Sequence, residues 1–144
     1  MPSGARILVV EDDEVMGSVL IKVLEREGYV IERVSDGRSA IDHLKDGRFD
    51  VVLTDLKIPG QDGLEVVKAT KQASPATEVI VMTAFGSVDT AVTAMKQGAY
   101  DYIRKPFTME EVVLLIQKAL EKGGLRREGE RLREEVRGRE GLEA

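Results

Sequence analysis

The segment Val51–Gly63 (VVLTDLKIPGQDG) begins with a short, mainly apolar run that ends at an acid, Asp55. A proline and two glycines follow and prevent regular structure from continuing. A short apolar run bounded by turn residues is typical of a buried strand. A carboxylate at the end of such a strand is costly unless another group compensates its charge. The segment therefore predicts a central strand that delivers a functional acid.

Apolar runs of strand length and apolar residues at helical spacing alternate along the rest of the chain. The predicted strands are Arg6–Val10, Tyr29–Val34, Asp50–Thr54, Glu78–Met82 and Tyr100–Arg104. A helical pattern follows each strand, with a cap at Ser35 or Asp36 for the second helix and at Thr108 for the last. Such alternation predicts an α/β fold with a parallel sheet covered by helices on both faces.

The side chains that could bind a ligand or take part in a reaction lie where the predicted strands end. In open parallel sheets the functional crevice lies beyond the carboxyl ends of the strands. Glu11, Asp12 and Asp13 follow the first strand, Asp55 the third, Thr83 the fourth and Lys105 the fifth. Asp13 alone is equally typical of a helix cap. The convergence of four strand ends on one edge of the sheet predicts a single site.

The residue types at this edge favour metal-assisted phosphoryl transfer. Neighbouring carboxylates cannot all stay ionised without a counter-charge. Oxygen ligands without histidine or cysteine favour a hard cation, of which Mg²⁺ is the leading candidate. A carboxylate can also act as a nucleophile toward a phosphoryl group. Such a transfer needs mainly charge neutralisation and alignment, which a metal, a lysine and a hydroxyl supply.

Composition limits the other classes of function. The 144 residues suffice for one domain and an appendage, and the net charge of −5 gives no sign of nucleic-acid binding. The absence of cysteine excludes disulfides and thiolate sites. No apolar stretch approaches the roughly 20 residues of a membrane span. We therefore expect no direct contact with nucleic acid or membrane, and a cytoplasmic location.

Four segments, ILVVEDD, VVLTDLKIPGQDG, VIVMTA and YIRKPF, resemble the signatures of the response regulator receiver domain of two-component signalling. The resemblance implies a flavodoxin-like (βα)5 fold with strand order 2-1-3-4-5 for residues 1–122. It also implies a phosphorylation-activated switch rather than a conventional enzyme. A sensor histidine kinase would be the partner that donates the phosphoryl group.

The resemblance also assigns roles to individual residues. It implies that Asp55 is the phospho-acceptor, that Thr83 and Lys105 contact the phosphoryl group, and that Tyr102 acts with Thr83 as the switch. It further implies that the protein ligands of Mg²⁺ are Asp12, Asp55 and the backbone carbonyl of Lys57, and that Glu11 acts through water. The family usually has a cis bond at the position of Lys105-Pro106. Glu11 is a mild departure, because many members carry aspartate there.

The segment 123–144 mixes acidic and basic residues, which is typical of a solvated helix. Leu125, Leu132 and Val136 stand at coiled-coil spacing, but Gly123-Gly124 and Gly129 interrupt the pattern, so a flexible linker remains the alternative. The stretch from Thr83 to Phe107 is similar to receivers of the nitrogen-regulatory, sigma-54-dependent activators. In that class a linker joins the receiver to an ATPase domain, so we expect a fragment of a longer transcription regulator.

The same residues predict how the domain associates and also raise alternative functions. A dimer is expected through the helix Val88–Gln97, the fifth strand and the last helix, or through the linker. The domain could instead act alone by protein contact, or be a degenerate receiver used only for dimerisation. A haloacid-dehalogenase-like phosphatase needs a second acid two residues after its nucleophile, where this chain has Lys57. A flavin binder needs a phosphate loop where this chain has acids.

Overall fold

The computed structural model describes residues 4–60, 62–84 and 88–122. The strands are β1 (Arg6–Val10), β2 (Val30–Val34), β3 (Val51–Asp55), β4 (Glu78–Thr83) and β5 (Asp101–Arg104). The helices are α1 (Glu14–Arg26), α2 (Gly37–Asp46), α3 (Gly63–Ala73) and α4 (Val88–Lys96), with a final helix described over residues 109–122. The predicted charged tail at 123–144 lies outside the described residues.

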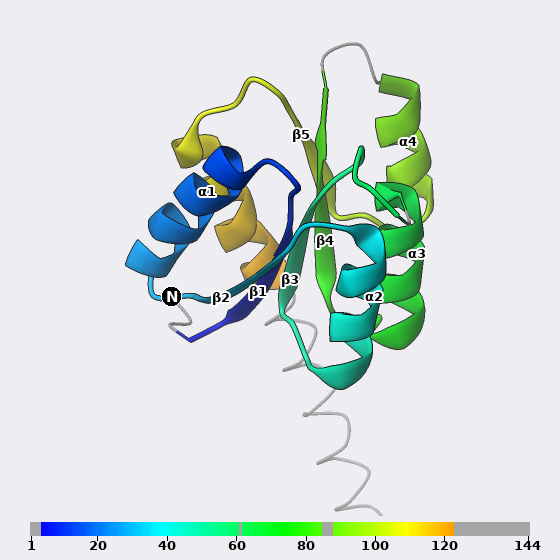
Figure 1. Ribbon diagram of the computed structural model, residues 1–144, viewed down its shortest axis with the longest axis horizontal. Coiled ribbons are helices and arrows are strands. Elements are labelled where there is room, and N and C mark those ends of the chain that lie inside the picture. The colour runs from blue at the N-terminus through cyan, green and yellow to red at the C-terminus, as the bar shows by residue number, and fades with distance from the viewer. Residues whose placement is uncertain (1–3, 61, 85–87, 123–144) are drawn as a thin grey trace, which may run out of the picture.

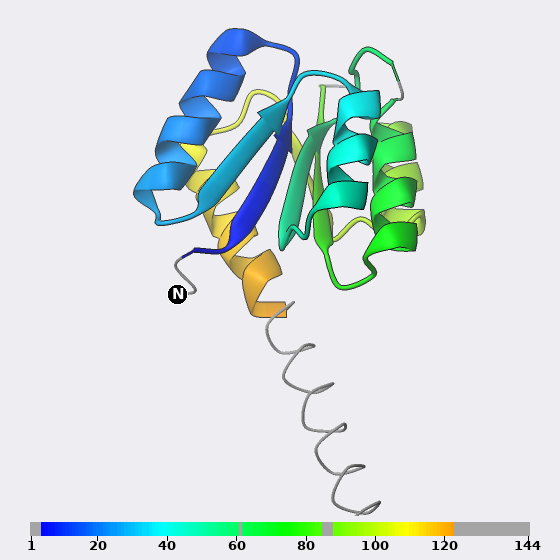
Figure 2. The same ribbon diagram turned by 60° about the horizontal axis from the view of Figure 1, so that its bottom comes forward.

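All strand pairs are parallel, and the sheet order is β2-β1-β3-β4-β5. Figures 1 and 2 show α1 and the final helix on one face of the sheet and α2, α3 and α4 on the other. The predicted fold class and strand order are thus confirmed. None of the helices that the structure describes combines the length and the apolar character needed to cross a membrane.

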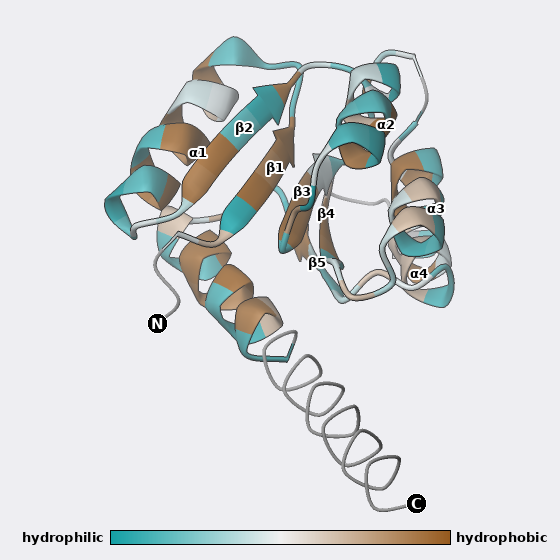
Figure 3. Cartoon of the chain, turned by 90° about the horizontal axis from the view of Figure 1, so that it is seen from below, coloured by the Kyte–Doolittle hydropathy of each residue, from teal (hydrophilic) through white to brown (hydrophobic). Residues whose placement is uncertain are grey.

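The sheet separates two apolar cores. Alternate residues of a strand point to opposite faces, so Leu53 of β3 packs with α1 and the final helix, whereas Val52 packs with α2, α3 and α4. Every residue of β3 and β4 is buried, which explains their nearly continuous apolar sequences. Figure 3 shows the hydrophobic colour concentrated on these strands and on the inward sides of the helices.

Acidic and hydroxyl side chains cap the helices at the end nearest the strand carboxyl termini. Asp36, rather than Ser35, caps α2 and accepts a hydrogen bond from the Ser39 N–H at 2.7 Å. The hydrogen bonds from Ser39 lower the pKa of Asp36. The predicted cap at Thr108 pairs reciprocally with Glu111, because each side chain accepts from the other's backbone N–H.

Three predicted strands begin one residue later than expected, after Tyr29, Asp50 and Tyr100. The backbone N–H of Tyr29 donates to the carbonyl of Leu24 and so closes the end of α1 instead of joining the sheet. The Tyr29 side chain is buried in the core, and its hydroxyl has no hydrogen-bond partner among the described residues. Its role is therefore packing.

The buried Tyr29 hydroxyl gives a test of this account. We expect Tyr29→Phe to leave the free energy of unfolding unchanged or to raise it by up to about 1 kcal/mol, because no hydrogen bond is lost. Thr77→Val is the matched control: the buried Thr77 hydroxyl donates to the Phe49 carbonyl at 2.6 Å, and its loss should cost about 1–2 kcal/mol. Urea unfolding at neutral pH measures both.

Alkaline pH should increase the difference in the free energy of unfolding between the wild type and Tyr29→Phe. Burial, aided by the charge of Glu27, raises the pKa of Tyr29 above its ordinary value of 10.0. The unfolded chain therefore releases this proton at lower pH than the folded chain, and stability falls as pH rises above that value. The fall should be smaller in Tyr29→Phe. A variant that loses stability at neutral pH would contradict this account.

Candidate functional site

Three carboxylates meet at the carboxyl edge of the sheet. Val10 and Thr54 are register partners in β1 and β3, so the next residues, Glu11 and Asp55, emerge side by side. Glu11, Asp12 and Asp55 each offer an oxygen within 4.8 Å of the others. Glu11 is fully buried, Asp55 is 7% exposed and Asp12 is exposed. The predicted convergence of strand ends therefore brings these acids together.

Lys105 joins the cluster from beyond β5. Its Nζ donates to Glu11 Oε1 at 3.2 Å and also to Asp55 Oδ2. The backbone N–H of Lys105 donates to the carbonyl of Thr83 at 2.8 Å, which ties the lysine to the end of β4. The following peptide bond, Lys105-Pro106, is cis. The ammonium is thus held between the two most buried acids.

The charges within the cluster shift its ionisation. Burial raises the pKa of the Glu11 carboxyl, the charge of Asp55 raises it further, and Lys105 offsets part of the effect. Burial alone would lower the pKa of Lys105, but its hydrogen bonds and charge pairing with Asp55 and Glu11 outweigh it and the net shift is upward. One ammonium faces three carboxylates, so the cluster keeps an excess of negative charge.

The acids fit a hard divalent cation. Glu11 Oε2 is buried and has no hydrogen-bond partner among the described residues. A buried carboxylate oxygen in that state is costly unless it is protonated or meets a cation. The donors are all oxygens, which Mg²⁺ prefers. Glu11, Asp12 and Asp55 are therefore suited to hold Mg²⁺.

The structure also describes the other predicted site residues. Thr83 ends β4 and is buried, with its hydroxyl 3.4 Å from the carbonyl of Ala84. The N–H of Lys57 donates to Asp55 Oδ1 at 3.0 Å, so both Asp55 oxygens accept hydrogen bonds. Tyr102 lies on β5 and is 37% exposed. Asp13 is the N-cap of α1 and accepts from Met16.

Sequence reasoning missed Gly63. A Cβ at Gly63 would lie 2.5 Å from the Asp55 carbonyl oxygen and 2.5 Å from Leu56 Cα. The start of α3 therefore packs directly on the backbone that follows the acid. A glycine immediately after the helix cap Asp62 was the available signal.

Sequence reasoning also missed Arg33. Its guanidinium on β2 donates twice to the backbone carbonyl of Glu11, at 2.9 and 3.2 Å. No sequence pattern marks this contact, because the acceptor is a backbone group on another strand.

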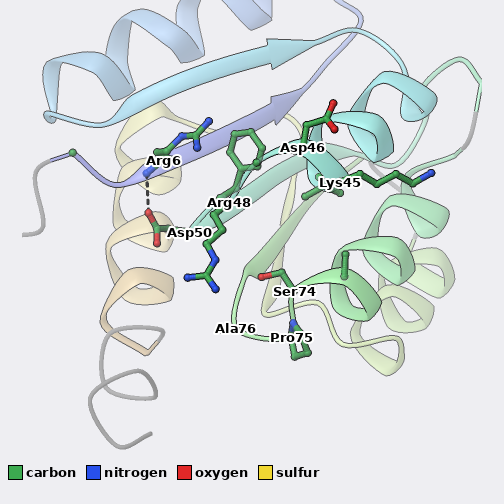
Figure 4. Close-up of a pocket in the computed structure, with 13 residues that line it drawn as sticks. Arg6, Lys45, Asp46, Arg48, Asp50, Ser74, Pro75 and Ala76 are labelled. Atoms are coloured by element: carbon green, nitrogen blue, oxygen red, sulfur yellow. Dashed lines mark hydrogen bonds between the residues drawn. The ribbon is translucent and has the colours of Figure 1, made fainter. Parts of the chain in front are cut away.

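A cavity of about 850 Å³ opens at the opposite end of the sheet, where the strands begin (Figure 4). Arg6 and Asp50 lie on its wall and are joined by a hydrogen bond from the Arg6 N–H to Asp50 Oδ2 at 2.8 Å. The Arg6 guanidinium lies over the Phe49 ring and pairs with Glu32. None of the clustered acids lines this cavity, so we assign the site to the other end.

Comparison with known proteins gives a family for this arrangement. The family described as "Response regulator receiver domain" matches residues 7–117. The chain is 36% identical over 123 residues to Regulatory protein AtoC of Escherichia coli (strain K12), covering 85% of this chain and 27% of that protein. It is 39% identical over 114 residues to DNA-binding transcriptional regulator NtrC of the same organism, covering 79% and 24%. The chain thus spans about a quarter of these two relatives.

Solved structures agree with the sequence relatives. NtrX from Brucella abortus in complex with ADP superimposes with a TM-score of 0.84 at 33% identity, covering 90% of this chain and 30% of that chain. A response regulator receiver domain protein from Clostridium thermocellum gives a TM-score of 0.80 at 31% identity, covering 84% and 98%. The match to NtrC and AtoC agrees with the predicted sigma-54 activator class. The chain belongs to the response regulator receiver domain family of two-component systems.

Proposed function

We propose that this domain is a switch that accepts a phosphoryl group on Asp55 from a sensor histidine kinase. Receiver domains are signalling domains that act with such kinases. The observation that carries the proposal is the cluster itself, in which Asp55 ends a rigid buried strand beside two acids and one lysine. That arrangement has a nucleophile and the groups that would compensate its charge.

In the proposed reaction an Asp55 oxygen attacks the phosphorus, an O–P bond forms, and the P–N bond to the kinase histidine breaks. The Lys57 N–H and the Lys105 ammonium hold the two carboxylate oxygens and fix the direction of attack. Lys105 then exchanges its carboxylate partner for a phosphoryl oxygen, and the Thr83 hydroxyl donates to another. The Lys57 N–H and the Lys105 ammonium already contact the carboxylate before the reaction. Stabilisation of charge by groups placed in advance is the main requirement of phosphoryl transfer.

The proposed Mg²⁺ ligands are Asp12, Asp55 and the Lys57 carbonyl, with Glu11 acting through water. When bound, the ion would neutralise negative charge on the acids and on the incoming phosphoryl group. Asp12 is exposed, so the ion has a route from solvent. The buried Glu11 Oε2 supports this assignment, because it gains a compensating charge.

The proposed signal runs from Thr83 to the face formed by α4, β5 and the final helix. A phosphoryl group adds about −1.5 to −2 charge and three strong acceptors. The Thr83 hydroxyl would turn toward it, and Tyr102 would move into the space that this vacates. Such a local charge can bias a two-state element. We propose that the loop Ala84–Ser87 moves with Thr83; its residues 85–87 lie outside the described residues.

Dimerisation and a transcription-activating output domain complete the proposal. Val92, Met95 and Tyr102 are each more than a third exposed and lie on α4 and β5, so this face offers apolar surface for a second copy. The length of NtrC and AtoC beyond the matched part supports a further domain after the receiver. A receiver that acts alone through the same face is the second candidate.

Removal of the metal tests the central step. Incubation with acetyl phosphate and Mg²⁺ should add one phosphoryl group, seen as a single mass increment on the intact protein. Excess EDTA should abolish the increment, because the acids then repel the incoming phosphate. Restoring Mg²⁺ should restore it. Full labelling in EDTA would refute the metal requirement, and no labelling under any condition would refute the receiver function.

A further inference from the structure

We propose that Arg33 is a positioning residue that orients the acidic pair Glu11-Asp12 for Mg²⁺ binding and for phosphorylation of Asp55. The inference rests on the proposed function and adds to it a residue that contacts neither the metal nor the phosphoryl group. Arg33 lies on β2, next to β1, in register with Val9. Its side chain reaches toward the carboxyl edge of the sheet, where the acids emerge.

Two contacts hold the backbone of Glu11 from opposite sides. Its N–H donates to the carbonyl of Val34 at 3.1 Å. Its carbonyl accepts from Arg33 Nη2 at 2.9 Å and from Arg33 Nε at 3.2 Å. The acceptor carbonyl belongs to the peptide that joins Glu11 to Asp12. The guanidinium therefore fixes the rotation of the peptide that carries one acid at each end.

Gly17, in the first turn of α1, makes room for the Arg33 side chain. Gly17 is buried, and a Cβ there would come within 2.2 Å of Arg33 Nε and 2.8 Å of Arg33 Cζ. Glycine costs roughly 1 kcal/mol against alanine inside a helix. The absence of a side chain at Gly17 and the placement of Arg33 are thus two halves of one arrangement.

This contact bears on the metal because the acids must converge. Glu11 is fully buried and points to Lys105, whereas Asp12 is exposed. Without Arg33 the peptide between them could rotate, and Asp12 would no longer be held beside Asp55. Groups that hold metal ligands in place typically contribute roughly 10- to 100-fold in metal affinity. We expect the lower end, because Val34 still holds the Glu11 N–H.

The Mg²⁺ affinity of Arg33→Ala separates positioning from simple charge. A cation near the acids repels Mg²⁺, so a purely electrostatic role predicts tighter binding when Arg33 is removed. Positioning predicts weaker binding, with a roughly tenfold higher Kd for Mg²⁺. NMR titration of amide signals at constant ionic strength measures the Kd. Arg33→Lys keeps the charge but loses the two-nitrogen contact, and should fall between the wild type and Arg33→Ala.

Gly17→Ala provides a second variant that leaves Arg33 in the sequence. The new Cβ displaces the Arg33 guanidinium. The Kd for Mg²⁺ should therefore rise as it does in Arg33→Ala, and labelling by acetyl phosphate should slow in both variants. In the double variant Gly17→Ala/Arg33→Ala, the first substitution should add no further change in the Kd for Mg²⁺. There it should raise the midpoint of thermal unfolding, because alanine favours the helix and no longer meets Arg33.

The controls distinguish this inference from the proposed function. Arg6→Ala removes an arginine at the other end of β1 and should leave the Mg²⁺ Kd unchanged. If the wild type accepts phosphoryl groups but Arg33→Ala and Gly17→Ala bind Mg²⁺ as the wild type does, the positioning role is wrong and the switch stands. If the wild type is never labelled, the proposed function fails first. Independent effects of the two substitutions in the double variant would also overturn the pairing.

Discussion

Asp55→Asn is expected to take up no phosphoryl group from acetyl phosphate and Mg²⁺, whereas the wild-type domain gains one. The amide lacks the anionic oxygen that attacks phosphorus, and it cannot replace the carboxylate as a cation ligand of equal strength. The loss should therefore be complete on the time scale of wild-type labelling. Intact-mass measurement over a time course gives the result directly.

The fold should survive this substitution. The amide of Asp55→Asn would lose the ion pair with Lys105, but the repulsion from Glu11 would disappear as well. We expect these opposing changes to leave the free energy of unfolding within about 1 kcal/mol of the wild type. Asp50→Asn is the matched control at the opposite end of β3, where the side chain accepts from the Arg6 N–H. It should be labelled like the wild type.

The pair of variants gives a clear decision. Labelling of Asp55→Asn at the wild-type rate would move the acceptor to another residue, with Asp12 the first to test because it is exposed in the same cluster. Loss of labelling in Asp50→Asn together with intact folding would show that the reaction depends on more than the carboxyl edge of the sheet.

Gly63→Ala is expected to lower the free energy of unfolding by about 3 kcal/mol, the upper part of the range for overpacked sites. The new Cβ would lie 2.5 Å from the Asp55 carbonyl oxygen and from Leu56 Cα, and 3.0 Å from Leu56 Cδ2. Two of these neighbours are backbone atoms at the end of a central strand, so a change of side-chain rotamer cannot relieve the contact. Urea unfolding measures the loss.

Gly47→Ala is the control, because a Cβ there meets only ordinary contacts, the nearest at 3.5 Å from the Arg6 guanidinium. It should change stability by less than about 0.5 kcal/mol. Gly63→Ala should also slow labelling of the fraction that remains folded, since relief of the contact moves the peptide after Asp55. A stable Gly63→Ala protein would mean that α3 can shift without cost to the strand.

The sequence predicts the fold and the acidic cluster because both depend on patterns that run along the chain. A parallel sheet brings its strand ends to one edge, so Glu11, Asp55 and Lys105 could be grouped before any coordinates were known. The role of Asp13 could not be assigned from the sequence, because an acid that follows a strand is equally suited to cap a helix and to bind a metal. The structure makes it the cap.

The contributions of Gly63 and Arg33 could not be predicted, because they depend on distances between elements rather than on patterns within them. Gly63 matters through backbone atoms that precede it by seven and eight residues. Arg33 matters through a carbonyl on a neighbouring strand. Tyr29 illustrates the same limit: its side chain fits a strand, but the end of α1 takes its backbone N–H.

The division of the interior by the sheet has a consequence for how such a module can diversify. Side chains that pack under α1 and the final helix belong to a different apolar cluster from those under α2, α3 and α4, and substitutions without shared neighbours combine nearly additively. A substitution in one cluster should therefore leave the packing of the other cluster nearly unchanged, so each face of the sheet can accumulate its own core substitutions. The two faces of the sheet can thus diverge in sequence separately, although they share the same strands.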